Sequence, residues 1–424
     1  MVNGNRSKNA SMETIIWWHV YPLGFLGAPI RPRSASQRVL THRLRRLIPW
    51  LDYMSDLGAT GLFLGPIFDS QTHGYDTIDY FSIDPRLGDL NDFDDLMRAC
   101  RERGITVMLD GVFNHVGTGF PAFRNALAGL DDQDMFTIRR SDQGNPDYAK
   151  FEGHASLPEL NHDSPRVAQL VRDVMEFWLA KGIGAWRLDA AYTTQTHFWQ
   201  HVLPEVRTQF PKVWFMGEVI QADYPTVIRE SGFDSLTQYE LWKAIWSSLK
   251  DGNFFELDWC LQRHDGFMDV FTPQTFIGNH DVTRIASQVG IDKAALACVV
   301  QFSVGGVPSI YYGDELGMTG VKEDRPGGDD AVRPAFPAKP QPFNELSESQ
   351  SRIFGIYRSL IEMRKANPWL AQARTKSTLL ENRRYMYEST GEHGETLSVD
   401  LQLDPHPHAE VHLPDGSVLS IAME

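Results

Sequence analysis

The feature that most constrains the fold is a series of eight short apolar runs, separated by longer segments whose apolar residues recur every three or four positions. Short apolar runs predict buried strands, and the longer spacing predicts amphipathic helices. Strands that alternate with helices form parallel sheets, and eight such units are typical of an α/β protein with a closed (β/α)₈ TIM barrel. The expected strands are residues 15–20, 61–65, 105–112, 185–190, 213–219, 235–239, 275–279 and 308–313.

Two regions break this alternation. About fifty residues rich in Asp, Gly, Asn and Pro separate the third strand from the next helix, and irregular insertions of that length are usually functional. Beyond residue 367 the pattern changes to alternating strands with turn residues between them. We therefore expect a flexible N-terminus (1–13), a barrel (14–113 and 166–367), a short inserted B domain (114–165) and a small C-terminal all-β domain (368–424).

The charge balance restricts the partners of the chain. Forty Lys and Arg stand against 55 Asp and Glu, which gives a formal net charge of -15 at pH 7. An acidic surface repels phosphate backbones, so the sequence predicts no nucleic-acid partner. No apolar run reaches the roughly 20 residues that span a bilayer, so no membrane association is expected.

Cysteine usage indicates the compartment. Cys100, Cys260 and Cys298 are odd in number, far apart and without a metal-binding spacing. This pattern indicates buried thiols in a reducing environment. The N-terminal segment is polar and lacks the apolar core of a secretory signal. We therefore expect a cytoplasmic protein.

Polar residues gather where the predicted strands end, and in (β/α)₈ enzymes the chemistry lies at those carboxyl ends. Three acids stand out among them: Asp189, Glu218 and Asp281. The other polar residues at the expected barrel mouth are Tyr75, Asp76, Asp110, Asn114, His115, Arg187, Asn279 and His280. An acid-rich mouth of this kind is typical of a divalent-metal site or of glycoside hydrolysis.

Glycosidic cleavage needs one carboxylic acid to protonate the leaving oxygen and a second carboxylate to attack carbon or activate water. Asp189 and Glu218 follow adjacent strands, whose spacing of about 4.8 Å suits the roughly 5 Å separation of a retaining pair. Arg187 shares a strand face with Asp189 and should keep it ionised, as a nucleophile requires. Glu218 follows the apolar run WFMG, a setting expected to raise its pKa and favour a general acid.

Seven segments, in order along the chain, resemble the α-amylase family, glycoside hydrolase family 13, over nearly the whole length. They are HGYDTIDYFSIDPRLGD (73–89), DGVFNH (110–115), LPELN (157–161), GAWRLDAA (184–191), FMGEV (215–219), FIGNHD (276–281) and GGVPSIYYGDELGM (305–318). The resemblance implies Asp189 as nucleophile, Glu218 as acid/base and Asp281 as transition-state stabiliser. It also implies substrate contacts, with Tyr75 stacking on the attacked sugar: Tyr75, Asp76, His115, Arg187, His280 and Arg333.

Departures from the family pattern narrow the expectation. The region after the first strand, residues 27–43, contains no Asp where many members carry a metal loop, and Tyr192-Thr193 stand where α-amylases place a calcium-binding Lys-His pair. We therefore expect no structural metal and no cofactor. Thr72 stands where exo-acting α-glucosidases of the oligo-1,6-glucosidase type place an Asp. The N-terminal carbohydrate-binding domain of the cyclodextrinase and neopullulanase group is expected to be absent.

The leading hypothesis is a retaining hydrolase of α-glucosides, acting on α-linked gluco-oligosaccharides or disaccharides through a covalent glycosyl-enzyme intermediate. A transglycosylase, isomerase or phosphorylase would use the same intermediate and a different acceptor, and the sequence leaves these open. The other class is a non-catalytic carbohydrate-binding member of the fold. Such members usually lack one or more of the three acids, and all three are present here.

Overall fold

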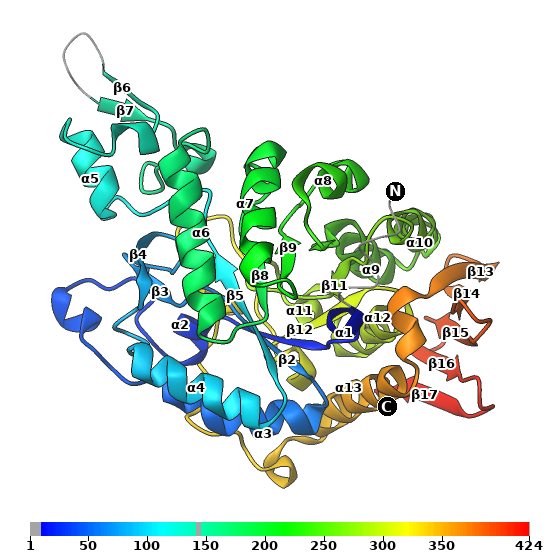
Figure 1. Cartoon of the computed structure of the whole chain (residues 1–424). Helices are drawn as coiled ribbons and strands as arrows, with labels where there is room; N and C mark the ends of the chain where they lie inside the picture. The colour runs from blue at the N-terminus through cyan, green and yellow to red at the C-terminus, as the bar shows by residue number, and fades with distance from the viewer. Residues whose placement is uncertain (1–9, 141–145, 424) are drawn as a thin grey trace.

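The barrel predicted from the eight apolar runs is confirmed. The computed structural model describes residues 10–140 and 146–423, and eight parallel strands form one sheet in the order β10-β9-β8-β5-β2-β1-β12-β11 (Figure 1). A parallel bridge between Thr237 and Gln274 joins the two edges and closes the barrel. The strands are β1 (Trp17–Val20), β2 (Gly61–Leu64), β5 (Thr106–Gly111), β8 (Ala185–Leu188), β9 (Trp214–Gly217), β10 (Ser235–Leu236), β11 (Gln274–Phe276) and β12 (Val307–Tyr311).

Side-chain alternation along the strands separates the inside of the barrel from the outside. Trp17 and Trp214 point inward and stack with their ring centroids 6.3 Å apart, and Met108 joins the same interior cluster. Trp18 and Trp186 point outward into the larger core under the helices. The barrel interior is therefore apolar toward the amino ends of the strands, which leaves the opposite end for polar side chains.

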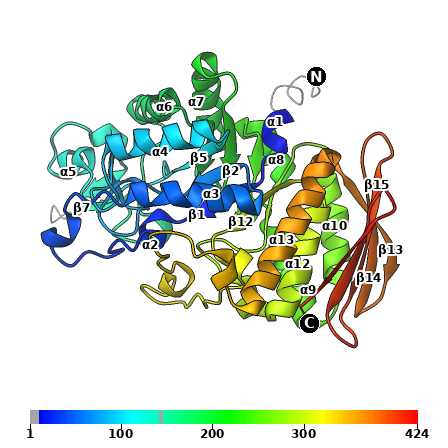
Figure 2. The ribbon, with the colours of Figure 1, turned by 90° about the horizontal axis from the view of Figure 1, so that it is seen from below.

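Helices cover the outside of the barrel, as Figures 1 and 2 show. Local signals fix their ends: Asp89 and Asp92 form a capping box at the start of α4, and Gly58 ends α3 in the left-handed region at φ 101°. The long helices are α3 (Ile48–Leu57), α4 (Leu90–Glu102), α6 (Pro165–Ala180), α7 (Thr196–Gln209), α8 (Tyr224–Ser231), α9 (Tyr239–Asp251), α10 (Phe255–Met268), α12 (Ile291–Ser303) and α13 (Glu348–Ala366). Shorter helices are α1 (Ala10–Glu13), α2 (Pro22–Phe25) and α11 (Ile285–Val289).

Two excursions leave the barrel. The first follows β2 and contains an antiparallel pair, β3 (Phe68–Ser70) and β4 (Thr77–Ile83), which the sequence did not predict. The second is the B domain between β5 and α6, which holds α5 (Pro121–Leu127) and a hairpin of β6 (Ile138–Arg140) and β7 (Pro146–Tyr148). It projects from one end of the molecule in Figure 1. A bridge between His115 and Glu159 ties its two ends together at the barrel mouth.

The C-terminal domain is a five-stranded antiparallel sheet that packs against α10 and α12 (Figure 2). Its strands are β13 (Arg374–Leu380), β14 (Arg384–Thr390), β15 (Thr396–Gln402), β16 (His408–His412) and β17 (Val418–Ala422). The last four were predicted. The first, β13, was not, because Thr375 is the one residue of this strand that is fully buried and the apolar alternation is therefore weak.

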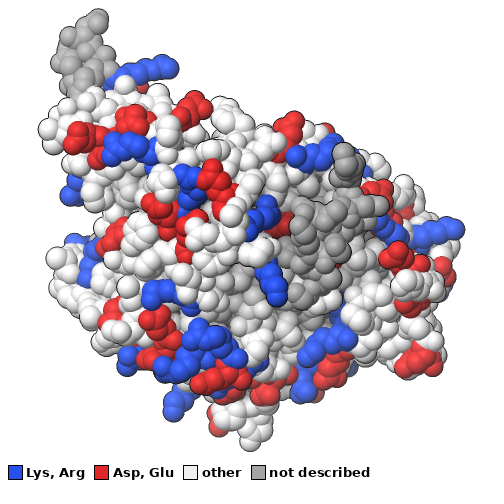
Figure 3. Space-filling model, viewed as in Figure 1, with Lys and Arg blue, Asp and Glu red and all other residues white. Residues whose placement is uncertain are grey.

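The predicted flexible N-terminus, 1–13, lies largely outside the described residues. Within it, Ala10–Glu13 form α1 and Met12 is buried, so this end of the segment is packed. Across the part of the chain that the structure describes, no helix has both the length and the apolar character to cross a bilayer. On the face shown in Figure 3, acidic and basic side chains are interspersed, with no extended basic region.

Candidate active site

Strand register brings two acids side by side at the barrel mouth. Arg187 points into the barrel from β8, and Asp189 continues that face just past the end of the strand. Leu188 pairs with Gly217 of β9, and the next N–H, of Glu218, donates to the Leu188 carbonyl at 2.9 Å. The ladder therefore places Asp189 and Glu218 next to each other on adjacent strands, about 4.8 Å apart at the backbone.

One buried guanidinium serves three carboxyl groups. Register pairs Asp110 of β5 with Arg187, whose Nη1 donates to both Asp110 oxygens at 2.7 Å. The same Nη1 donates to Asp189 Oδ1 at 3.0 Å, and Nη2 lies 2.7 Å from Glu218 Oε1. We call Asp110, Asp189 and Glu218 around Arg187 the mouth cluster. Its acids outnumber its cation.

The electrostatics of the mouth cluster differ from those predicted. Burial raises the pKa of Asp189 well above its usual range; Arg187 opposes this effect, and Glu218 and Asp110 add to it. The expectation that Arg187 keeps Asp189 ionised is therefore wrong. Three carboxyls thus share one guanidinium, so their ionisation is coupled through Arg187.

The predicted apolar setting of Glu218 is also wrong, because both of its oxygens accept hydrogen bonds. Oε2 accepts the Ala190 N–H at 2.9 Å, and Oε1 accepts from Arg187 and from the Tyr239 hydroxyl, the latter at 3.1 Å. Ala190 has φ 47°, a left-handed conformation that costs energy for a residue with a side chain. This turn at the end of β8 aims its N–H at Glu218.

Asp281 lies in the loop after β11 and has two partners of its own, Arg333 and His280. Arg333 Nη2 lies 2.7 Å from Oδ1, and His280 Nε2 lies 2.8 Å from Oδ2. Burial alone would raise the pKa of Asp281, but His280 and Arg333 outweigh it and hold this pKa well below its usual range. Asp281 is therefore ionised.

A pocket of about 480 Å³ opens above these acids. Of the residues predicted from the sequence, six line it: Tyr75, His115, Asp189, Glu218, Asp281 and Arg333. Arg187 and His280 are buried beneath the pocket and hold the residues that line it. The structure does not bring Asp76 to the pocket, because its carboxylate accepts the Thr72 N–H at 2.9 Å and the Thr72 hydroxyl at 2.5 Å.

Aromatic contacts fix two side chains on the pocket wall. The Tyr75 ring stacks on His280 with centroids 5.3 Å apart, and its hydroxyl donates to Asp110 at 3.1 Å. His115 stacks on Phe151 of the B domain at 4.5 Å. Burial lowers the pKa of His115 to about 3, so this imidazole is neutral.

Sequence reasoning missed several pocket residues: Phe151, Glu152, Ile220, Tyr239, Trp242 and Lys322. The run 235–239 was predicted as a strand, but β10 ends at Leu236 and Tyr239 is the first residue of α9. Tyr192, noted from the sequence as a departure from the amylase pattern, donates to Glu152 of the B domain at 2.8 Å. This bond joins the B domain to the loop after β8 across the pocket wall.

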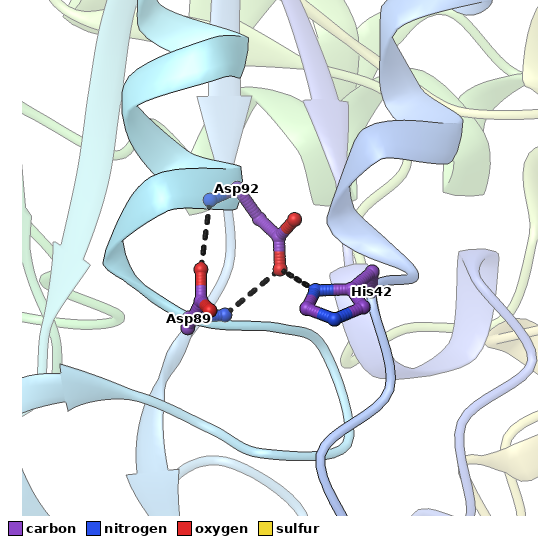
Figure 4. Close-up of side chains that lie close together, drawn as sticks. All are labelled: His42, Asp89 and Asp92. Carbon is purple, nitrogen blue, oxygen red and sulfur yellow. Dashed lines mark hydrogen bonds and ion pairs between the residues drawn. The ribbon is translucent and has the colours of Figure 1, made fainter.

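Among the described residues, one group of three potential metal ligands lies close together: His42, Asp89 and Asp92 (Figure 4). Its oxygens are already engaged. Asp89 Oδ1 accepts the Asp92 N–H at 3.0 Å, and Asp92 Oδ2 accepts the Asp89 N–H at 3.0 Å and lies 2.7 Å from His42 Nδ1. Arg45 Nε lies 2.5 Å from the other Asp92 oxygen. A cation beside the group and two capping bonds fit a helix start better than a metal.

Known proteins resemble the chain in both sequence and fold. It is 32% identical over 383 residues to a cyclomaltodextrinase of Geobacillus thermopakistaniensis (strain MAS1), covering 84% of this chain and 64% of that protein. It is 30% identical over 359 residues to neopullulanase 2 of Thermoactinomyces vulgaris, covering 81% of this chain and 59% of that protein. The chain thus spans less than two thirds of the length of these curated relatives.

Among solved structures, a cyclic α-maltosyl-(1→6)-maltose hydrolase from Arthrobacter globiformis, in complex with its named sugar, matches with a TM-score of 0.80. The two are 25% identical, and the match covers 97% of each chain. The family model described as the α-amylase catalytic domain matches residues 40–339, which include all three acids of the site. The chain therefore belongs to the α-amylase family.

Proposed function

We propose that this protein is a retaining α-glucoside hydrolase that acts on α-linked gluco-oligosaccharides or disaccharides. One observation carries the proposal: Asp189 and Glu218 lie side by side on adjacent strands and share Arg187 at the floor of a pocket. A retaining glycosidase needs two carboxyls about 5 Å apart, whereas an inverting one needs room for a water between them. The short spacing of neighbouring strands favours the retaining arrangement.

The reaction divides between the two neighbouring acids. Asp189 attacks the anomeric carbon as the bond from that carbon to the glycosidic oxygen breaks, and Glu218 gives its proton to the leaving oxygen. The covalent glycosyl-enzyme intermediate is then opened by water, whose proton returns to Glu218.

Asp281 supplies negative charge where the transition state becomes positive. His280 and Arg333 hold it ionised, so it can stabilise the oxocarbenium-like sugar without taking up the proton. Tyr75 offers an aromatic ring to the attacked sugar, and His115 offers a neutral imidazole to a hydroxyl group. Arg187 and His280 act from beneath by holding the acids in place.

The names of the relatives support the substrate class. A cyclomaltodextrinase, a neopullulanase and a hydrolase of cyclic maltosyl-maltose all act on α-linked glucose oligomers by their names. We also propose a cytoplasmic location. The three cysteines are free and buried, and another relative, 28% identical, is an intracellular maltogenic amylase of Bacillus subtilis.

Product analysis tests the proposal. The protein is incubated with α-1,1, 1,2, 1,3, 1,4 and 1,6 glucose disaccharides, maltooligosaccharides and cyclic glucans, and the anomer of the first product is followed by NMR. We expect hydrolysis with an α-anomeric product, and a slow fluoro-sugar substrate should label Asp189. A β-anomeric first product would refute retention. Larger sugars without net hydrolysis would indicate a transglycosylase, and no turnover together with no label would indicate a binding protein.

A further inference from the structure

A chain of hydrogen bonds with a fixed direction reaches the acid Glu218 from the opposite side of the site. It begins at the Asp281 backbone N–H, which donates to Asn279 Oδ1 at 2.8 Å. A backbone N–H can only donate, so this contact identifies the Asn279 oxygen and leaves the amide nitrogen as a donor. That nitrogen, Nδ2, donates to the Tyr239 hydroxyl oxygen at 3.0 Å.

The Tyr239 hydroxyl has one proton, and its hydrogen-bond partners determine where that proton points. Because the oxygen accepts from Asn279, the proton is free to point to Glu218 Oε1, 3.1 Å away. Burial raises the pKa of Tyr239 well above its usual range, so the phenol stays protonated at every working pH. Tyr239 and Asn279 are each 8% exposed, so solvent competes little for these bonds.

The two oxygens of Glu218 are therefore unequal. Oε1 receives two donors, Arg187 Nη2 and the Tyr239 hydroxyl, and two donors occupy both lone pairs of a carboxyl oxygen. Oε2 receives one donor, the Ala190 N–H, and keeps one position for a proton. Glu218 lines the pocket, and Oε2 is its oxygen with a lone pair left for a proton.

We propose that Tyr239 and Asn279 are positioning residues that confine the catalytic proton of Glu218 to Oε2. The inference rests on the proposed function, since it assigns the acid of that reaction its proton-bearing atom. Because this series of hydrogen bonds starts at the Asp281 backbone, it also fixes the position of Glu218 relative to Asp281. The charged or titratable groups that face Glu218 are Asp110, Arg187, Asp189, Tyr192 and Tyr239.

Tyr239→Phe removes the donor and keeps the ring. The hydroxyl stabilises ionised Glu218, so its loss should raise the Glu218 pKa and move the alkaline limb of kcat/KM upward by about one pH unit. We expect kcat on a disaccharide to fall about tenfold, with a smaller loss on α-glucosyl fluoride, whose leaving group needs no proton. If the alkaline limb of the kcat/KM profile does not move in this variant, the proposal is overturned, whatever the change in kcat.

Asn279→Asp tests the direction of the chain. The substitution keeps an acceptor for the Asp281 N–H but replaces the Nδ2 donor with an oxygen, so the Tyr239 proton should turn away from Glu218. The alkaline limb should again move upward, at least as far as in Tyr239→Phe. A limb that stays in place or moves downward would contradict the assigned donor order.

Tyr385→Phe is the matched control, because the Tyr385 hydroxyl donates to a buried carboxylate, Asp258, at 3.0 Å in the packing between α10 and β14. Its pH profile should match that of the wild type. The Glu218 pKa can also be measured without turnover, by infrared titration of its protonated carboxyl band against Glu218→Gln. An inactive wild type would refute the proposed function alone, whereas an equal band titration in wild type and Tyr239→Phe would refute the positioning role alone.

Discussion

Two clusters of buried acids lie in this barrel, and they are built differently. In the mouth cluster, three carboxyls share the single cation Arg187 below an open pocket. In the second, which we call the β12 cluster, Asp314 and Glu315 follow β12. Arg284 Nη1 lies 2.8 Å from Asp314, while Glu315 accepts the Tyr53 hydroxyl at 2.9 Å and the Gly313 N–H at 2.8 Å.

A raised pKa does not distinguish the two clusters. Burial raises the pKa of Asp314 to about 6 and that of Glu315 to about 7, and it raises the pKa of Asp189 as well. The mouth cluster differs from the β12 cluster in two ways: its acids share one cation, and it opens to a pocket. The acids of the β12 cluster each have their own partners, whereas the acids of the mouth cluster compete for one cation, which couples their ionisation.

The largest expected effect is on kcat, which should depend on the mouth cluster and not on the β12 cluster. Asp189→Asn should lower kcat by at least about three orders of magnitude, because it removes the proposed nucleophile. Its unfolding midpoint should not fall, since one of three crowded carboxyl groups around a single cation becomes a neutral amide. The matched variant Asp314→Asn should do the reverse and lower the midpoint while kcat is kept. Near-normal turnover in Asp189→Asn would remove this residue from the nucleophile role.

A second effect concerns stability alone. Arg284→Met leaves Asp314 without its cation in a fully buried position and should lower the free energy of unfolding by about 3–5 kcal/mol, measured by urea denaturation. Turnover at a temperature where the variant is folded should stay close to that of the wild type. A loss below about 1 kcal/mol would show that the β12 cluster contributes little to stability.

Glu315→Gln gives a pH-dependent test. The folded-state pKa of Glu315, about 7, lies above its ordinary value of 4.5, so the wild type is favoured by protonation at low pH and loses stability as the pH rises from about 4.5 to 7. The amide can still accept the Gly313 N–H and donate to Tyr53. The variant should therefore gain stability relative to wild type across that window, by up to about 3 kcal/mol above pH 7. Parallel stability curves would contradict the assignment.

The smallest effect belongs to an exposed pair. Arg31 lies 2.7 Å from Asp330, and both side chains are partly in solvent, with 38% and 55% exposure. Arg31→Ala should change the free energy of unfolding by less than about 1 kcal/mol, and any change should shrink in 1 M salt. A loss as large as that of Arg284→Met would mean that burial does not set the difference between these pairs.

The sequence predicted the barrel and its acids for a physical reason. Parallel strands buried on both faces read as apolar runs, and their carboxyl ends meet at one mouth, so Asp189, Glu218 and Asp281 could be placed together from position alone. The pKa argument for Asp189 failed because it considered one neighbour along the chain and left out burial, which raises this pKa most. Arg187 is two residues from Asp189, but Asp110 and Glu218 reach it through strand register.

The role of Tyr239 had no local signal. It depends on where β10 stops and α9 begins, and on a contact with Asn279 forty residues away. Asp76 shows the opposite failure, because a segment that resembles the family pattern contains a side chain that is committed to Thr72. Local patterns fix which residues reach the mouth, while long-range packing decides which of them meet.

The closure of the barrel has a consequence for this site. β10 and β11 are joined by the bridge from Thr237 to Gln274, with the Gln238 N–H also donating to the Gln274 carbonyl at 2.9 Å. Tyr239 follows β10 and Asn279 follows β11, and their hydrogen bond links the two segments at the barrel mouth. The junction between β10 and β11 therefore lies beside the hydrogen bonds that orient Glu218. A local separation of β10 from β11 would therefore alter proton transfer from Glu218 before the protein unfolds.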